Sequence, residues 1–209
     1  GHAPVLVCED ADIEKAVTAL IGAKFLNNAG QVCVAPTRMF VARPRYTEFC
    51  EALAQAAHGL RVGASNEDGV QMGPLIHERH VAKVCSYFDV ARQDGATIAV
   101  GGKAHDGPGG GHYVEPTLVT GAHGKMRVAQ EEVFGPFVTV LTFKTDEEAL
   151  QIANGTDYGL GSGLWTYKVG QARCAFLEET YGAGTLQRIL EESPRLIRSQ
   201  DRGGVSSFR

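Results

Sequence analysis

The sequence predicts a layered α/β domain with a largely parallel sheet. Short β-prone apolar runs alternate along the chain with amphipathic stretches of helical period. This alternation is typical of α/β proteins, in which helices connect parallel strands. The 209 residues are 44% hydrophobic and 21% charged, an ordinary globular composition that allows one large domain or two small ones. No internal repeat is visible.

The first predicted elements lead to a single cysteine. Residues 5–7 form a short apolar run that predicts a strand. Apolar side chains then recur at three- and four-residue steps, so an amphipathic helix is predicted over 12–28. Gly30 is expected to end this helix, and a β-prone run follows at 38–42. Cys33 is therefore predicted to lie on a loop between two rigid elements, where reactive side chains are commonly placed.

The alternation continues through the middle of the chain. Pro44 is expected to begin a second helix, because proline is tolerated in the first helical turn. The polar, glycine-rich stretch 63–73 is expected to be a loop. The remaining patterns predict helices at 44–58 and 77–94 and strands at 97–100 and 113–119.

A glycine-rich segment at 101–112 resembles a phosphate-binding loop only superficially. No Lys-Ser/Thr pair follows its glycines at 107–111, and no strand–loop–helix frame surrounds it. We therefore expect a flexible surface connection here. Beyond it, the patterns predict a strand at 137–143, a helix from the Thr145 cap to about 154, a strand within 159–166, a helix near 168–180 and a strand at 184–186.

Charge and cysteine content exclude several classes of protein. A net charge of −4 argues against a nucleic-acid partner, which would need clustered Lys and Arg. No apolar run has the length of a membrane span, and no secretory signal opens the chain. The five cysteines are scattered without a CxxC spacing, so neither disulfides nor a metal site is indicated. A reducing, cytoplasmic setting is expected.

Cys33 taken alone suggests a small buried hydrophobic residue, which is the usual role of a free cysteine. Its neighbours suggest a nucleophile. The segment Asn27-Asn28-Ala29-Gly30-Gln31-Val32-Cys33 closely resembles the nucleophile segment of the aldehyde dehydrogenase superfamily, in which a cysteine follows a Gly-Gln-x step. A second block, Glu131-Glu132-Val133-Phe134-Gly135-Pro136, resembles that family's other signature. The blocks follow in the family's order, with Glu132 placed 99 positions after Cys33 (132 minus 33).

This resemblance covers nearly the whole chain. It implies the family's catalytic domain, a three-layer α/β/α fold, over residues 1–186. It also implies oxidation of an aldehyde to a carboxylic acid with NAD or NADP, in a homo-oligomer that is a dimer or a tetramer. After residue 186 the family's Pro-x-Gly-Gly-x-Lys pattern is largely missing, so 187–209 is a divergent or truncated segment.

The resemblance also implies roles for three residues. Cys33 would attack the aldehyde carbonyl to give a thiohemiacetal and then a thioester, and its own N–H would help to hold the oxyanion. Glu132 would accept hydrogen bonds from the nicotinamide ribose hydroxyls, although a surface carboxylate is the simpler interpretation of it alone. Phe134 would pack near the nicotinamide, although alone it would be a core aromatic.

The first residues predict that this chain is a piece of a longer protein. Gly1 would be the last glycine of the family's Glu-Leu-Gly-Gly motif, whose glutamate is the general base. The base, the oxyanion-hole asparagine and the nucleotide-binding domain are therefore expected upstream. No GxGxxG fingerprint is present in the chain, in keeping with that expectation. This chain by itself is expected to be inactive.

Three questions stay open at the level of sequence. The chain looks most like the succinate-semialdehyde and α-ketoglutarate-semialdehyde dehydrogenase branch, with betaine and general aliphatic aldehydes as alternatives. Arg38 could anchor a substrate carboxylate, but a structural role is favoured at a strand start. The chain could also be a non-catalytic domain that keeps the fold for assembly or partner binding. A cysteine hydrolase is disfavoured, because none of the seven histidines shows a pattern that pairs it with Cys33.

Overall fold

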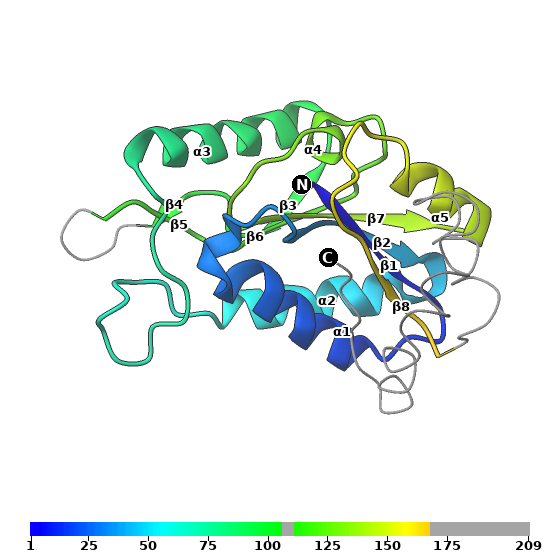
Figure 1. Cartoon of the computed structure of the whole chain (residues 1–209), viewed down its shortest axis with the longest axis horizontal. Helices are drawn as coiled ribbons and strands as arrows, with labels where there is room; N and C mark the ends of the chain where they lie inside the picture. Colours follow the sequence, from blue (N-terminus) through cyan, green and yellow to red (C-terminus); the bar gives the residue numbers. More distant parts are fainter. Residues whose placement is uncertain (106–110, 168–209) are drawn as a thin grey trace, which may run out of the picture.

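A six-stranded mixed sheet forms the centre of the computed structural model, which describes residues 1–105 and 111–167 (Figure 1). The strand order is β3-β6-β7-β2-β1-β8, and β4 and β5 form a separate pair. The strands are β1 Ala3–Val7, β2 Pro36–Ala42, β3 Thr97–Val100, β4 Ala104–His105, β5 Tyr113–Val114, β6 Thr117–Thr120, β7 Phe137–Phe143 and β8 Gly163–Trp165. The helices are α1 Ile13–Leu20, α2 Tyr46–His58, α3 Glu78–Gln93, α4 Arg127–Gln130 and α5 Asp146–Ala153.

Four of the five strand pairs in the sheet of the described chain are parallel. β2 lies between β1 and β7 and runs parallel to both. β8 extends the parallel order beyond β1, and β6 extends it beyond β7. β3 at one edge is antiparallel to β6. The predicted α/β class with a largely parallel sheet is confirmed.

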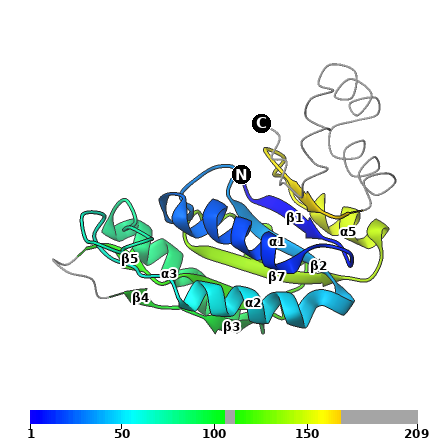
Figure 2. The same ribbon diagram turned by 90° about the horizontal axis from the view of Figure 1, so that it is seen from below.

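Side chains alternate between two apolar cores, one on each face of the sheet. On β1, Val5 and Val7 join a core that includes residues of α1, α2 and α3. Leu6, which points the other way, packs in a second core with Ala149 and Leu150 of α5. Figures 1 and 2 both show α1 and α2 side by side next to the strands. The described residues therefore form the three predicted layers.

Local capping explains where two of the helices begin. Asp12 accepts a hydrogen bond from the backbone N–H of Lys15 at 3.1 Å, and Thr145 accepts one from that of Glu148 at 3.2 Å. Thr145 was expected as a cap from the sequence. The helices predicted at 44–58, 77–94 and 145–154 are present as α2, α3 and α5.

The helix predicted over 12–28 is wrong in its second half. The α-helical part ends at Leu20, and a π-helical turn at Ile21–Leu26 replaces the remaining α-helix. The chain leaves helical geometry at Asn27, with ψ of 94°. A π-turn inserts an extra residue into the helical repeat, which a pattern of three- and four-residue steps does not reveal.

The single strand predicted over 113–119 is also wrong, because the structure has two strands in different sheets. β5 pairs with β4, whereas β6 pairs with β3 and β7. The chain changes partners at Pro116, whose nitrogen has no hydrogen to donate to a ladder. Thr117 resumes pairing by donating its N–H to the carbonyl of Pro136 at 2.8 Å. The paired β4 and β5 also show that 101–112 is not wholly an irregular connection.

Some predicted elements lie outside the described residues. These are the helix near 168–180, the strand at 184–186 and most of the run at 107–111. Among the helices that the structure does describe, none combines the length and apolar character needed to span a bilayer.

Candidate active site

Cys33 lies on an exposed turn between the π-helical segment and β2. The N–H of Ala35 donates to the carbonyl of Val32 at 3.0 Å and closes the turn around the cysteine. Of the four cysteines in the described part of the chain, Cys33 is the exposed one. Burial raises the pKa of Cys50 to about 11 and also raises the pKa of Cys85. Among the cysteines of the described residues, position and access therefore single out Cys33 as the thiol that a substrate can reach.

Three consecutive residues before this turn adopt left-handed backbone geometry. Asn28 and Ala29 each have φ of 51°, and Gly30 has φ of 75°. Asn28 donates its side-chain amide to the carbonyl of Gln31, and Gln31 donates its own to the carbonyl of Asn28, at 3.1 and 3.0 Å. Left-handed geometry disfavours an alanine, so these reciprocal bonds help to hold a strained loop.

Gln31 also ties this loop to a second one. Its side-chain oxygen accepts the N–H of Ile76 at 2.9 Å. The glutamine of the Gly-Gln step therefore has a structural role, since its amide nitrogen bonds to Asn28 in its own loop and its oxygen bonds to Ile76 in the second loop.

Gly30 brings the nucleophile loop against the second signature block. A Cβ built on Gly30 would overlap the carbonyl oxygen of Gly135 and lie 2.7 Å from its carbonyl carbon. A glycine is required here both by the positive φ and by this close approach of two backbones. Two segments that are far apart in sequence thus meet beside Cys33.

Glu132 lies beside the backbone of Cys33, with Gly1 between them. A Cβ on Gly1 would overlap the carbonyl oxygen of Cys33 and lie 2.8 Å from Oε1 of Glu132. The nitrogens of Gly1 and His2 donate to the two carboxylate oxygens of Glu132 at 3.0 and 3.2 Å. The Glu132 side chain is 17% exposed, so the carboxylate is held in place but remains open to a ligand.

The His2 ring is buried and fixed on both sides. Nε2 lies 3.0 Å from the carbonyl of Ala129, and Nδ1 lies 3.0 Å from the hydroxyl of Thr37. A carbonyl can only accept, so Nε2 carries the proton and Nδ1 accepts from Thr37. Burial, followed by the charge of Arg38, lowers the pKa of His2 to about 4. A neutral ring therefore anchors the backbone N–H that holds Glu132.

Phe134 has an unusual backbone that a histidine stabilises. Its φ is 57°, which is rare for a bulky residue. Nε2 of His80, on α3, lies 2.7 Å from the carbonyl oxygen of Phe134, and the two rings meet edge-on with centroids 6.3 Å apart. The Phe134 side chain is partly buried. Phe134 therefore has a left-handed backbone conformation that His80 supports.

Arg38 has the structural role that the sequence favoured. Its guanidinium is buried and donates to the carbonyls of His2, Ile152 and Ala153 at 3.1, 3.4 and 3.0 Å. The last two carbonyls lie at the carboxyl end of α5, where a positive charge is favourable. Arg38 is thus committed to backbone carbonyls and is not directed at a substrate carboxylate.

The sequence analysis did not identify Lys24, which lies beneath the loop that leads to Cys33. Its side chain is fully buried, and its Nζ makes no hydrogen bond in the described chain. The signal was present, because Lys24 follows Leu20 by four positions and Ile21 by three and so lies on the buried stripe of the helix. A lysine on an apolar stripe just before the nucleophile loop is therefore a candidate functional residue that the sequence alone indicates.

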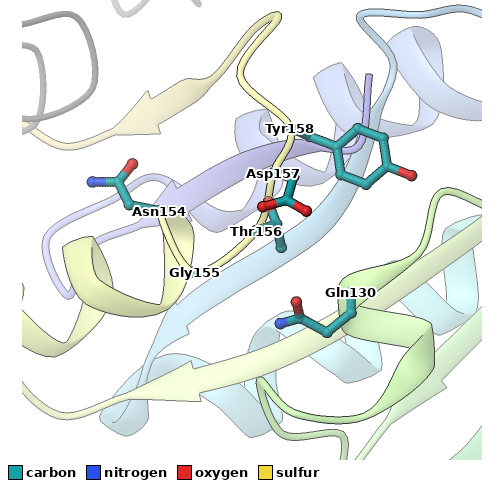
Figure 3. A pocket seen from close by; sticks show the side chains of 6 residues that line it. All are labelled: Gln130, Asn154, Gly155, Thr156, Asp157 and Tyr158. Carbon is teal, nitrogen blue, oxygen red and sulfur yellow. The ribbon is translucent and has the colours of Figure 1, made fainter.

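A polar surface pocket of about 390 Å³ opens near the site. It is lined by Gln130, Asn154, Gly155, Thr156, Asp157 and Tyr158 (Figure 3). The Tyr158 ring meets the buried His2 ring edge-on, with centroids 5.3 Å apart. The pocket contains none of Cys33, Glu132 and Phe134. No group of metal-ligating side chains occurs within residues 1–105 and 111–167.

Comparisons with known proteins agree with this geometry. The sequence model of the aldehyde dehydrogenase family matches residues 1–187. The chain is 41% identical to 2-aminomuconic 6-semialdehyde dehydrogenase from a Pseudomonas species, covering 82% of this chain and 35% of that protein. It is 38% identical to the NADP-dependent succinate-semialdehyde dehydrogenase of Escherichia coli, covering 82% of this chain and 36% of that protein.

Solved structures show the same relationship. Betaine aldehyde dehydrogenase from Staphylococcus aureus in complex with NAD+ superposes with a TM-score of 0.79 at 40% identity, over 83% of this chain and 35% of that one. The chain thus spans about a third of the length of the relatives it matches. A family match over residues 1–187 and these shared folds lead to one conclusion: the chain belongs to the aldehyde dehydrogenase family.

Proposed function

We propose that this chain is the nucleophile-bearing portion of an NAD(P)-dependent aldehyde dehydrogenase, with Cys33 as its nucleophile. The observation that carries the proposal is the meeting of an exposed Cys33 turn with the carboxylate of Glu132, bridged by Gly1. In the S. aureus relative, a cysteine is modified by β-mercaptoethanol in the NAD+ complex, which supports the presence of a reactive thiol in this family.

Cys33 supplies the covalent chemistry in this proposal. Its thiolate adds to the aldehyde carbon, and the backbone N–H of Cys33 donates to the oxygen that becomes negatively charged. Loss of hydride from the carbon of this thiohemiacetal leaves a thioester on Cys33. Water then attacks the thioester, releases the carboxylic acid and returns the thiol. The open turn gives both aldehyde and water access to the sulfur.

The residues around Glu132 fit the nicotinamide end of the cofactor. The terminal nitrogen of Gly1 and the backbone N–H of His2 each hold one carboxylate oxygen, and the side chain is still partly exposed, as a binding site for a vicinal diol requires. Phe134 is partly exposed and offers an apolar surface for the ring. When bound, the oxidised nicotinamide accepts the hydride. The E. coli relative uses NADP+ and the S. aureus structure contains NAD+, so both cofactors belong to the proposal.

The proposed substrate is a semialdehyde, with betaine aldehyde as the alternative. Semialdehyde dehydrogenases and betaine aldehyde dehydrogenases both occur among relatives about 40% identical to this chain. Because Arg38 is occupied by backbone carbonyls, a carboxylate on the substrate would need another cation. We further propose residues 1–186 as the catalytic domain, 187–209 as a divergent segment, and a cytoplasmic homo-oligomer as the intact protein.

Steady-state assays of the intact protein test the proposal. Succinate semialdehyde and betaine aldehyde are supplied with NAD+ or NADP+, and the absorbance of the reduced nicotinamide is followed. We expect activity that is abolished in Cys33→Ser and retained in the matched control Cys85→Ser, whose sulfur is partly buried. Full activity in Cys33→Ser would refute the proposed nucleophile. Absence of aldehyde-dependent reduction with an intact Cys33 would instead favour a non-catalytic domain.

A further inference from the structure

The side chain of Lys24 is an amine for which the described fold provides no hydrogen-bond partner. Burying an ammonium group without a partner is unfavourable, and folded proteins seldom retain one unless it has a function. Lys24 is completely buried, and its Nζ lacks any acceptor among the described residues. A methionine of similar length would fill the same space without this penalty. The lysine therefore needs an explanation other than packing.

The position of Lys24 relates it to the proposed cofactor carboxylate. The residue belongs to the π-helical turn Ile21–Leu26, immediately before the nucleophile loop. A Cβ built on Gly30 would lie 3.0 Å from Cε of Lys24. The same Cβ would overlap the carbonyl oxygen of Gly135. Lys24 thus lies under the junction between the Cys33 loop and the segment that carries Glu132.

Charge connects the two residues through the protein interior. Glu132 is the group whose charge opposes the effect of burial on the Lys24 amine, and the pKa of that amine falls to about 7. No ion pair within 4 Å joins Lys24 to a carboxylate in the described chain, so the interaction acts at longer range. A low-dielectric interior screens such an interaction much less than water does. The amine is therefore placed to stabilise the Glu132 carboxylate while leaving both its oxygens to other donors.

We propose that Lys24 is a positioning residue whose charge holds the Glu132 carboxylate in place for the nicotinamide ribose, acting from beneath the Cys33 loop. The inference rests on the proposed cofactor role of Glu132. It adds a second charge, outside both signature blocks, to the cofactor site. It also explains why a buried cation is retained where an apolar side chain would stabilise the fold.

A double-mutant cycle on the intact protein tests this inference. NAD+ affinity is measured by titration at pH 6, where the Lys24 amine carries its proton, for wild type, Lys24→Met, Glu132→Gln and the double variant. We expect Lys24→Met to weaken NAD+ binding about tenfold and to add nothing in the Glu132→Gln background, since coupled neighbours are not additive. The melting temperature of Lys24→Met should rise, because a buried charge has been removed. Lys15→Met, at an exposed position of the preceding helix α1, is the matched control and should bind NAD+ as wild type does.

The outcomes separate failure of this inference from failure of the proposed function. If Glu132→Gln weakens NAD+ binding but Lys24→Met binds normally, or if the two effects simply add, the role of Lys24 is refuted and the proposed function stands. If Glu132→Gln binds NAD+ as tightly as wild type, the cofactor role of Glu132 fails and the Lys24 inference fails with it. Should Lys24→Met not fold, Lys24→Gln, which keeps a polar group but removes the charge, must show the same tenfold loss.

Discussion

Substituting Gly30 by alanine tests the junction on which the site depends. The new Cβ would overlap the carbonyl oxygen of Gly135, and the backbone at position 30 would have to keep a φ of 75°. Left-handed geometry costs a non-glycine residue about 1–2 kcal/mol. Relieving an overlap against a backbone atom, which cannot rotate away, costs about 1–3 kcal/mol more. Gly30→Ala should therefore lower the free energy of unfolding by about 2–5 kcal/mol.

Gly22→Ala is the matched control for this prediction. Gly22 lies in the π-helical turn eight residues earlier, and a Cβ there would have no atom within 4 Å. Alanine is a better helix former than glycine by up to about 1 kcal/mol, so this variant should be as stable as wild type or slightly more so.

Urea unfolding of the intact protein measures both effects, and iodoacetamide alkylation of Cys33 under native conditions reports on the loop. In Gly30→Ala the urea midpoint should fall and the alkylation rate of Cys33 should change, because the Cys33 turn moves away from the Glu132 segment. A Gly30→Ala variant with the wild-type midpoint and the wild-type alkylation rate would show that the contact with Gly135 does not hold the site together.

Three further predictions concern the supports of the site. Arg38→Met should lower the free energy of unfolding by about 2–4 kcal/mol, measured by urea titration, because three carbonyls lose their donor; an unchanged midpoint would contradict this. Folding lowers the pKa of His2 from 6.5 to about 4, so between these pH values the unfolded chain binds a proton that the folded chain does not. The free energy of unfolding should therefore fall by up to about 3 kcal/mol as the pH drops through this range. In His2→Asn that pH dependence should shrink, and an identical profile would argue against a buried neutral ring. His80→Leu should weaken NAD+ binding several-fold, because the Phe134 carbonyl loses its hydrogen-bond donor. His80→Gln, which can still donate, should bind NAD+ close to wild type. Equal affinities in the two variants would refute a role for His80 in supporting the site.

The sequence predicted the regular elements well because their patterns are local. The alternation of apolar runs predicted a largely parallel α/β sheet, and the cap at Thr145 marked a true helix start. The two signature blocks also identified the loop of Cys33 and the segment of Glu132 before their proximity was known. Each of these inferences needed only residues close together in the chain.

The errors and omissions come from contacts between distant segments. The π-turn before Asn27 and the change of partner at Pro116 depend on packing that no local pattern encodes. The contact of Gly30 with Gly135 joins positions 105 residues apart (135 minus 30), and periodicity gives no sign of it. Lys24 could have been found, since a lysine on an apolar stripe is visible in the sequence, but its meaning required the position of Glu132.

Mass spectrometry of the intact protein quenched during turnover tests the central claim most directly. The protein is mixed with succinate semialdehyde and NAD+, quenched in acid within one turnover and digested under conditions that preserve thioesters. The account predicts an acyl group on the peptide that contains Cys33, lost on treatment with hydroxylamine, and no acyl group on the peptides of Cys50 or Cys85. Rapid turnover with an unmodified Cys33 peptide, or an acyl group on another cysteine, would contradict it.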